Sequence, residues 1–375
     1  MQTTAQAWLV LQLTQSPLAL GTVTALQFLP IMLLSLLGGA IGDRFPKYRL
    51  IIIMQIAALI QALLFALLVS TGLVQLWHVY VLATIQGIIN AIDNPVRQAF
   101  AIELVGRERL VNAVALNSML FNGARIIGPA LAGLIIASAA NPLLGIGIVL
   151  FINALSFVAV LIGLLMMNRT EFIATPPHPG HMGRDLLDGL SYVWRTPIVL
   201  TVMMVVAAIG TFGYNFSVVL PLLSAFVLHT DAAGFGALSA FLGIGSLVGG
   251  LATAYAGQVS MRRLLVGSAS FGFLLAAVAL SDNYYLSGVL LVALGLAGIL
   301  FSTSASSLIQ LTTPDTLRGR VMGLYMLLFA GSTPIGGMFI GSLSSRIGVP
   351  ETLLLCALLC LLGVGGAFLH GRRSS

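Results

Sequence analysis

Residues 38–50, GGAIGDRFPKYRL, place one acid and three bases within a chain that is otherwise almost free of charge. Only 7% of the 375 residues are charged and 58% are hydrophobic, whereas about a quarter of a typical soluble domain is charged. The mean hydropathy is +1.05. A short charged segment between long apolar ones is typical of a loop that joins two membrane-spanning helices.

Eleven long apolar runs make up most of the chain, and most of them approach or exceed the ~20 residues that a helix needs to cross a bilayer. They are residues 19–36, 50–70, 78–92, 112–137, 144–167, 197–226, 233–256, 264–280, 285–310, 319–342 and 352–369. The runs contain almost no charge, and their Ala, Gly and Pro content suits helices packed on one another. We therefore expect an all-α polytopic membrane protein.

The basic residues fall in alternate loops. Fifteen of the 17 bases form six groups: Arg44, Lys47 and Arg49; Arg97, Arg107 and Arg109; Arg169, Arg184 and Arg195; Arg262 and Arg263; Arg318 and Arg320; Arg372 and Arg373. The remaining loops carry Asp231, Asp282 and Glu351 with a single base, Arg346. Because positive loops stay in the cytoplasm, these groups and the C-terminus are predicted to face it.

Residues 1–13 are too short to cross the membrane, and we expect them to be the outer half of a truncated first span. The prediction is then eleven full spans plus a partial one, in two bundles of six helices. Residues 168–196 are the only long polar segment and predict a cytoplasmic linker with an amphipathic helix. The expected domains are 1–167, 168–196 and 197–375. Glycines 123, 128 and 133 recur 208 residues later, as expected of two repeats.

Several motifs in order resemble one known family. Gly39-x-x-x-Asp43-Arg44 with Lys47 and Arg49 is similar to the loop motif of the major facilitator superfamily, and GARIIGPALAG (123–133) resembles the fifth-helix motif of its exporters. NPVRQAF (94–100) and RGRVMGLY (318–325) resemble the branch of enterobactin-type siderophore exporters and macrolide efflux proteins. The resemblance implies the major facilitator fold and export across a membrane.

The loop motif has two interpretations. The resemblance implies that Asp43 packs near Arg318 and Arg320 and holds the cytoplasmic side shut; alternatively, the bases only fix topology. Asp43 ends a helix, where the dipole disfavours an anion, so we expect it to lean on a cation or on the positive N-terminus of a neighbouring helix. The gate is favoured because a topology signal needs no acid. Pro46 and Tyr48 replace a glycine and a base of the family pattern. The predicted gating residues are Gly39, Asp43, Arg44, Lys47, Arg49, Asp93, Arg97, Arg318 and Arg320.

Asp93 is the one carboxylate that falls inside a predicted span, and an intramembrane acid suggests a functional site. An ion pair with Arg97, four residues on, is the structural alternative, and the spacing favours it. Gln86-Gly87 matches part of the fourth-helix proton motif of the superfamily, but Ala83 stands where that motif has arginine. Proton coupling is therefore implied by the resemblance alone.

Arg125 lies near the middle of a predicted span, where a cation is costly unless it is solvated or paired. Either it binds an anionic group of a substrate, or it is a structural cation held by carbonyls and Asn122. The exporter motif consists of Ala124, Gly128, Pro129, Ala132 and Gly133, and its small residues predict close helix packing. The candidate substrate-binding residues are Arg125, Asn122, Gln27, Phe212, Tyr214 and Asn215.

These observations predict a proton-coupled exporter of small amphiphilic molecules, either siderophores or hydrophobic drugs, that works by alternating access. The alternative is a non-transporting membrane scaffold or sensor. No catalytic constellation is present, so we expect no enzyme and no cofactor. Cys356 and Cys360 lack metal-binding partners and are interpreted as buried apolar residues. The expected partners are the bilayer, a small-molecule substrate and protons, with no nucleic acid. The expected state is a monomer in a bacterial inner membrane.

Overall fold

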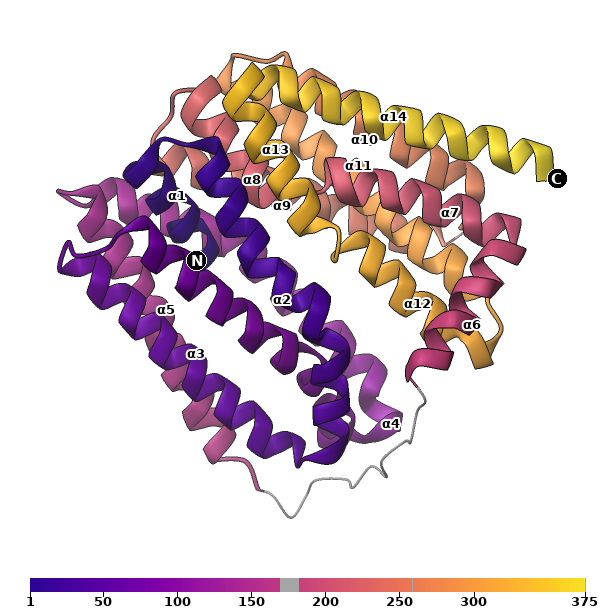
Figure 1. Ribbon diagram of the computed structural model, residues 1–375, viewed down its shortest axis with the longest axis horizontal. Helices are drawn as coiled ribbons and strands as arrows, with labels where there is room; N and C mark the ends of the chain where they lie inside the picture. Colours follow the sequence, from indigo (N-terminus) through magenta and orange to yellow (C-terminus); the bar gives the residue numbers. More distant parts are fainter. Residues whose placement is uncertain (169–181, 258, 375) are drawn as a thin grey trace. The chain divides into compact units, whose positions relative to one another are not determined.

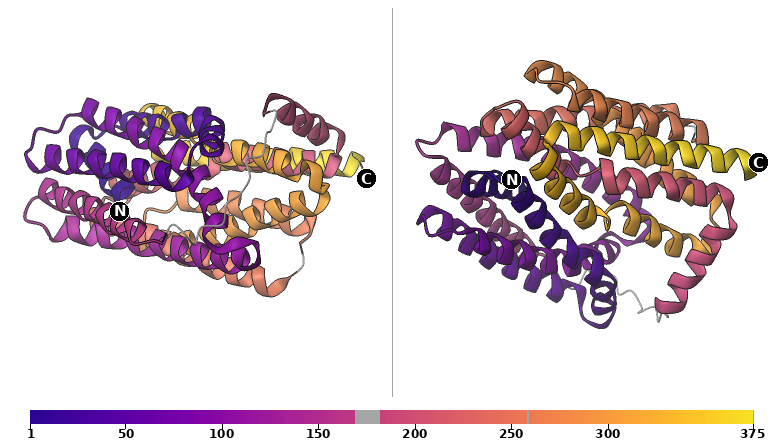
Figure 2. Two further views of the ribbon diagram at one scale, coloured as in Figure 1. Left: turned by 90° about the horizontal axis from the view of Figure 1, so that it is seen from below. Right: turned by 45° about the horizontal axis from the view of Figure 1, so that its top comes forward.

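The computed structural model describes residues 1–168, 182–257 and 259–374; of residues 35–43, 182–187, 256, 373, 374 and several positions between 102 and 121 it describes the backbone only. The described residues form helices joined by short connections, and no strand occurs among them (Figures 1 and 2). Within these ranges, nine helical segments are long and apolar enough to cross a membrane. The predicted all-α polytopic membrane protein is confirmed.

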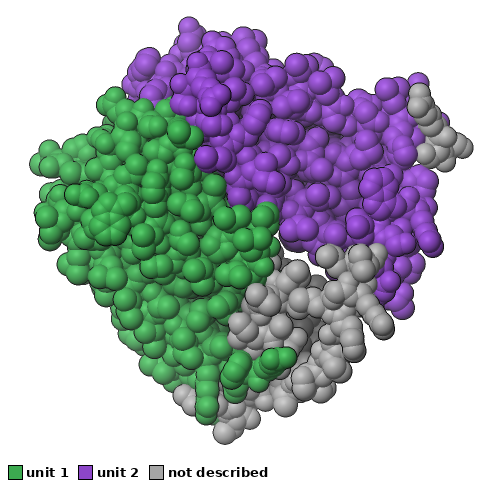
Figure 3. Space-filling model, in the orientation of Figure 1, with its two compact units in different colours: residues 1–179, 231–236 green, residues 180–230, 237–375 purple. Residues whose placement is uncertain are grey.

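The chain divides into two compact units (Figure 3). Unit 1 contains residues 1–179 and the first residues of α9, 231–236, whereas unit 2 contains 180–230 and 237–375. The helices of unit 1 are α1 (Gln2–Thr14), α2 (Pro17–Arg44), α3 (Lys47–Ser70), α4 (Leu76–Ser138) and α5 (Pro142–Leu165). Those of unit 2 are α6 (Met182–Arg195), α7 (Pro197–Ala208), η2 (Ile209–Gly213), α8 (Phe216–Leu222), η3 (Leu223–Val227), α9 (Ala232–Ala256), α10 (Met261–Ala279), α11 (Tyr284–Thr312), α12 (Asp315–Phe329), α13 (Thr333–Ile347) and α14 (Val349–Ser374).

Helix α4 differs from the sequence prediction. We expected a loop between apolar runs 78–92 and 112–137, but the backbone stays helical on both sides of one residue, Gly106, with φ 70° and ψ 172°. A residue without Cβ adopts this conformation at no steric cost, so the chain turns there in a single step. The basic residues that were expected in a loop therefore extend the two helices. In this region the basic residues lie where the apolar runs 78–92 and 112–137 end, but the helices continue beyond these runs.

Unit 1 is held together by close helix crossings. Helix α2 packs on α4, and α3 packs on α5 and α4. A Cβ at Gly87 of α4 would collide with the main-chain carbonyl of Gln27 in α2, so only glycine permits this approach. Near the start of α3, the Tyr48 hydroxyl donates a hydrogen bond to the Leu164 carbonyl of α5 at 2.9 Å. The Tyr48 ring belongs to a cluster of buried apolar residues.

Unit 2 contains two interrupted spans. The segment Pro197–Val227 includes the wide turns η2 and η3 and leaves the helical path at Tyr214 and Asn215. The second interruption separates α12 from α13, and Pro334 starts the new helix because its missing N–H costs nothing there. The two interruptions lie together, since a Cβ at Gly210 would meet the backbone of Leu328 and Phe329.

Helix α6 is amphipathic, as the linker sequence predicts, and it packs on α12 and α7. Val193 is buried, and Gly189 lies against Arg320. Trp194 is 67% exposed, which suits an aromatic ring at a membrane surface.

Candidate functional site

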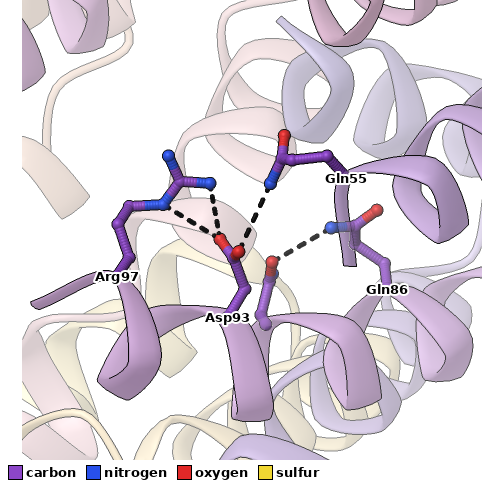
Figure 4. A network of polar contacts seen from close by, with 5 residues as sticks. Gln55, Gln86, Asp93 and Arg97 are labelled. Atoms are coloured by element: carbon purple, nitrogen blue, oxygen red, sulfur yellow. Dashed lines mark hydrogen bonds and ion pairs between the residues drawn. The ribbon is translucent and has the colours of Figure 1, made fainter. Parts of the chain in front are cut away.

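A buried carboxylate lies at the centre of a polar network in unit 1 (Figure 4). Asp93 of α4 is 7% exposed. Its Oδ2 accepts hydrogen bonds from Arg97 Nε at 3.1 Å and from an Arg97 terminal nitrogen at 2.8 Å, and its Oδ1 accepts from Gln55 Nε2 of α3 at 3.3 Å. The pair that the i, i+4 spacing favours is therefore present. One turn earlier, Gln86 donates to Asn90 at 3.0 Å.

Other buried amides of unit 1 make separate hydrogen bonds. Gln61 Nε2 donates to the Leu82 carbonyl at 3.1 Å, while its Oε1 accepts from Gln2. Gln6 Nε2 donates to Gln27 Oε1 at 3.1 Å. Among the described residues, the Oε1 atoms of Gln6 and Gln86 are buried and accept no hydrogen bond. Buried acceptors without donors are rare, which suggests a role for a bound molecule or for another state of the unit.

The charged loop motif is described in part. Of Gly39 and Asp43 only the backbone is described, so the Asp43 carboxylate lies outside the described part of the chain. Lys47 pairs with Glu103 of α4 at 2.7 Å, and both side chains are less than one-fifth exposed. Arg44 and Arg49 are exposed. Lys47 thus ties the start of α3 to α4, a contact that the sequence alone did not predict.

The arginines expected at the other side of the gate have acidic neighbours in unit 2. Arg318 pairs with Asp315, one turn earlier, at 2.5 Å, and its Nε donates to the Gln310 carbonyl. Arg320 pairs with Asp188 of α6 at 2.7 Å. These pairs fasten α6 and the start of α12 to their own unit. The expected approach of Asp43 to these arginines stays a prediction.

The exporter motif forms a tight helix crossing in unit 1. A Cβ at Gly133 would collide with the Ala232 carbonyl, and one at Gly236 would come within 2.6 Å of the Pro129 carbonyl. Ala132 is fully buried beside them, whereas Ala124, two turns earlier, is exposed. Gly128 faces Met1. Pro129 and the small residues therefore let α4 touch the first residues of α9, as the predicted close packing requires.

Arg125 is exposed, and no described side chain forms an ion pair with it. Asn122, which precedes it by three residues, is half-buried. An exposed guanidinium without an acidic partner is able to offer its paired donors to a carboxylate or catecholate. Both interpretations of Arg125 remain predictions.

The candidates in unit 2 meet at the first interruption. Asn215 is fully buried, and its Nδ2 donates to the Thr211 carbonyl at 2.7 Å, whereas its Oδ1 accepts nothing within the described chain. The Tyr214 ring lies 4.9 Å from Phe329 and 6.0 Å from Phe271. Phe212 packs edge-on against Phe339 at 5.4 Å. Phe271 is fully buried, whereas the other four rings are half-buried and form an aromatic surface suited to flat apolar molecules.

Sequence analysis missed the buried glutamines of unit 1: Gln6, Gln55, Gln61 and Gln86 are all at most 9% exposed. Polar residues within apolar runs were the available signal, because a buried amide in a membrane helix needs a partner. Cys356 and Cys360 are buried and free, as expected. In the described part of the chain, no group of His, Cys, Asp or Glu could hold a metal ion.

Comparisons with known proteins agree with this architecture. The staphyloferrin A transporter of Staphylococcus aureus is 26% identical over 351 residues, with 92% of this chain and 85% of the relative covered. The multidrug efflux pump Tap of Mycolicibacterium fortuitum is 28% identical over 382 residues, with 98% and 90% covered. A bacterial homologue of the human lysosomal transporter Spinster, solved inward-facing and unoccupied, superposes with a TM-score of 0.77 at 14% identity, with 99% and 94% covered.

The sequence also matches the transmembrane secretion effector family over residues 1–371, which is nearly its whole length. Such a match, together with relatives that transport molecules across membranes, excludes the enzyme class and confirms the resemblance that the motifs indicated. The chain belongs to the transmembrane secretion effector family of major facilitator transporters.

Proposed function

We propose that the chain is a secondary active exporter of small amphiphilic molecules, siderophores or hydrophobic drugs, and that protons entering by way of Asp93 drive the export. The observation that carries the proposal is the buried carboxylate between Gln55 and Arg97. An acid placed inside a bundle of membrane helices is costly and marks ion or proton pathways.

The chemistry follows from the partners of Asp93. As a carboxylate it accepts two hydrogen bonds from Arg97; with a proton it loses the charge that holds the guanidinium. Arg97 is half-exposed, so it then turns to water at small cost. Protonation of Asp93 thus weakens its pair with Arg97, which is a contact of one conformation. A proton that binds one conformation better than the other shifts the equilibrium between the two.

The substrate class follows from the candidate binding residues. The aromatic surface at Tyr214 and Phe212 suits an apolar ring, while exposed Arg125 suits an anionic group. An amphiphile carries both. Relatives named for staphyloferrin A transport and for multidrug efflux support this range.

The proposed topology completes this function. It has eleven full spans plus a partial one, in two six-helix bundles joined by the linker 168–196, within a bacterial inner membrane. The C-terminus and the basic loops face the cytoplasm, and the transporter acts as a monomer by rocker-switch alternating access. The two helical parts of α4 on either side of Gly106 would supply two of these spans.

Transport by purified full-length protein in liposomes tests the proposal. An imposed proton gradient should drive accumulation of an amphiphilic dye or siderophore. Asp93→Asn should abolish this accumulation yet retain exchange of labelled for unlabelled substrate. Asp282→Asn, which alters an exposed acid of unit 2, serves as the control and should transport normally. Proton-driven accumulation by Asp93→Asn at the control rate would remove Asp93 from the coupling.

A further inference from the structure

Two apolar grooves lie side by side at one end of unit 2. One has a volume of about 570 Å³ and lies among α7, α10, α11 and α14; the other has about 640 Å³ and lies between α10 and α14. Helices α10 and α14 pack along each other, as Figure 1 shows. Leu265 and Phe368 line both grooves and form the wall between them.

Each groove has an arginine at its rim. Arg372 lines the first groove and Arg262 the second, and none of the lining residues that the structure describes is acidic. The Arg372 guanidinium stands over the Phe368 ring at 4.5 Å, directly above the dividing wall. Both arginines are exposed. A positive rim above two apolar channels is complementary to a molecule with one anionic head and two apolar chains.

The position of Arg262 strengthens this charge argument. Arg262 and Arg263 occupy the first turn of α10, a helix of 19 residues. The helix dipole makes that end positive, so a further cation such as Arg262 is unfavourable there. An anion held near this turn would offset the repulsion. Basic pockets between membrane helices are known to take the headgroups of anionic lipids.

The length of the second groove matches one leaflet. On α10 its lining residues extend from Arg262 to Phe273, and on α14 they extend from Phe368, one turn before Arg372, back to Leu361. Eleven residues of helix rise about 16 Å, which is half of the roughly 30 Å hydrocarbon core. An acyl chain that starts at the arginines therefore ends near the middle of the bilayer.

We infer that these grooves hold one anionic phospholipid, with its phosphate between Arg262 and Arg372 and one chain on each side of Phe368. The inference is independent of the proposed transport function. It assigns the grooves to a lipid and not to the exported molecule, because their described lining is mostly apolar and its only charged side chains are the two arginines.

Lipid titration of the purified full chain, followed by native mass spectrometry, tests the inference. Dioleoyl phosphatidylglycerol should bind at least tenfold more tightly than dioleoyl phosphatidylcholine. The double variant Arg262→Gln/Arg372→Gln should reduce that preference below threefold. Arg346→Gln, an exposed arginine of α13 that lines neither groove, should keep it. Glycerol phosphate, which has the charge but no chains, should not displace the lipid.

Two glycines of α14 provide a second test that leaves every charge in place. A Cβ at Gly365 or at Gly366 meets no atom within 4 Å, so both tolerate a larger side chain, yet only Gly365 lines a groove. Gly365→Phe should fill the groove and weaken phosphatidylglycerol binding tenfold, whereas Gly366→Phe should bind as the wild type. Equal binding by this pair, or a lipid preference that survives the loss of both arginines, would overturn the inference.

Discussion

The Asp93–Arg97 pair should respond very differently to the loss of either partner. The Asp93 side chain is 10% exposed and that of Arg97 is 48% exposed. In Asp93→Asn, the new amide oxygen still accepts from Gln55, and Arg97 turns to solvent. The expected cost is that of a half-exposed ion pair, about 0.5–1 kcal/mol. In Arg97→Gln, a buried carboxylate keeps only the Gln55 amide at 3.3 Å, and losing the partner of a buried charge costs about 3 kcal/mol.

Arg97→Gln should therefore be less stable than Asp93→Asn by about 2 kcal/mol, or roughly 30-fold in the folding equilibrium. The double variant removes the stranded charge and should recover to within about 1 kcal/mol of the wild type. Denaturant titration of the purified proteins in one mild detergent at one pH measures all four values. If Arg97→Gln is as stable as Asp93→Asn, or if the double variant is as unstable as Arg97→Gln, the buried carboxylate is not the costly partner.

Three further predictions concern the motifs. Asp43→Asn should insert normally but lose most of its transport, as measured in liposomes at matched protein amounts; normal transport would reduce the loop motif to a topology signal. Arg125→Lys and Arg125→Gln should fold normally and lose affinity for anionic substrates more than for neutral ones; equal losses would favour the structural role. Gly133→Leu should lower the free energy of unfolding by about 1–3 kcal/mol, because its side chain meets the Ala232 carbonyl, whereas Gly123→Leu points into open space and should be neutral in the same unfolding assay.

The local elements of the fold could be predicted because each rests on a short-range rule. The apolar runs indicated membrane helices, the i, i+4 spacing indicated the Asp93–Arg97 pair, and the small residues around Gly133 indicated a close crossing. These three features depend either on neighbours within one helix turn or on local composition. A single sequence shows both kinds of information.

The remaining features depend on residues that are distant in sequence. The bond from Gln55 to Asp93 joins residues 38 positions apart, and the pair of Lys47 and Glu103 joins residues 56 apart. The interruptions near Asn215 and Ala330 arise where glycines bring two spans into contact. The spacing of apolar residues along one helix does not tell which other helix packs against it. These contacts could therefore be identified only from the structure.

The two interrupted spans of unit 2 have a mechanical consequence. Gly336 of α13 lies against Thr211 and Asn215 of the other interrupted span, just as Gly210 lies against the end of α12. Two neighbouring helices that are interrupted at the same level can bend together there. If only one of them were interrupted, the continuous neighbour would hold it straight. At this level the Phe329 ring stacks on Tyr325 and lies tilted against Tyr214. We therefore expect unit 2 to bend at the level of the two interruptions, with the helical segments on either side moving as rigid bodies.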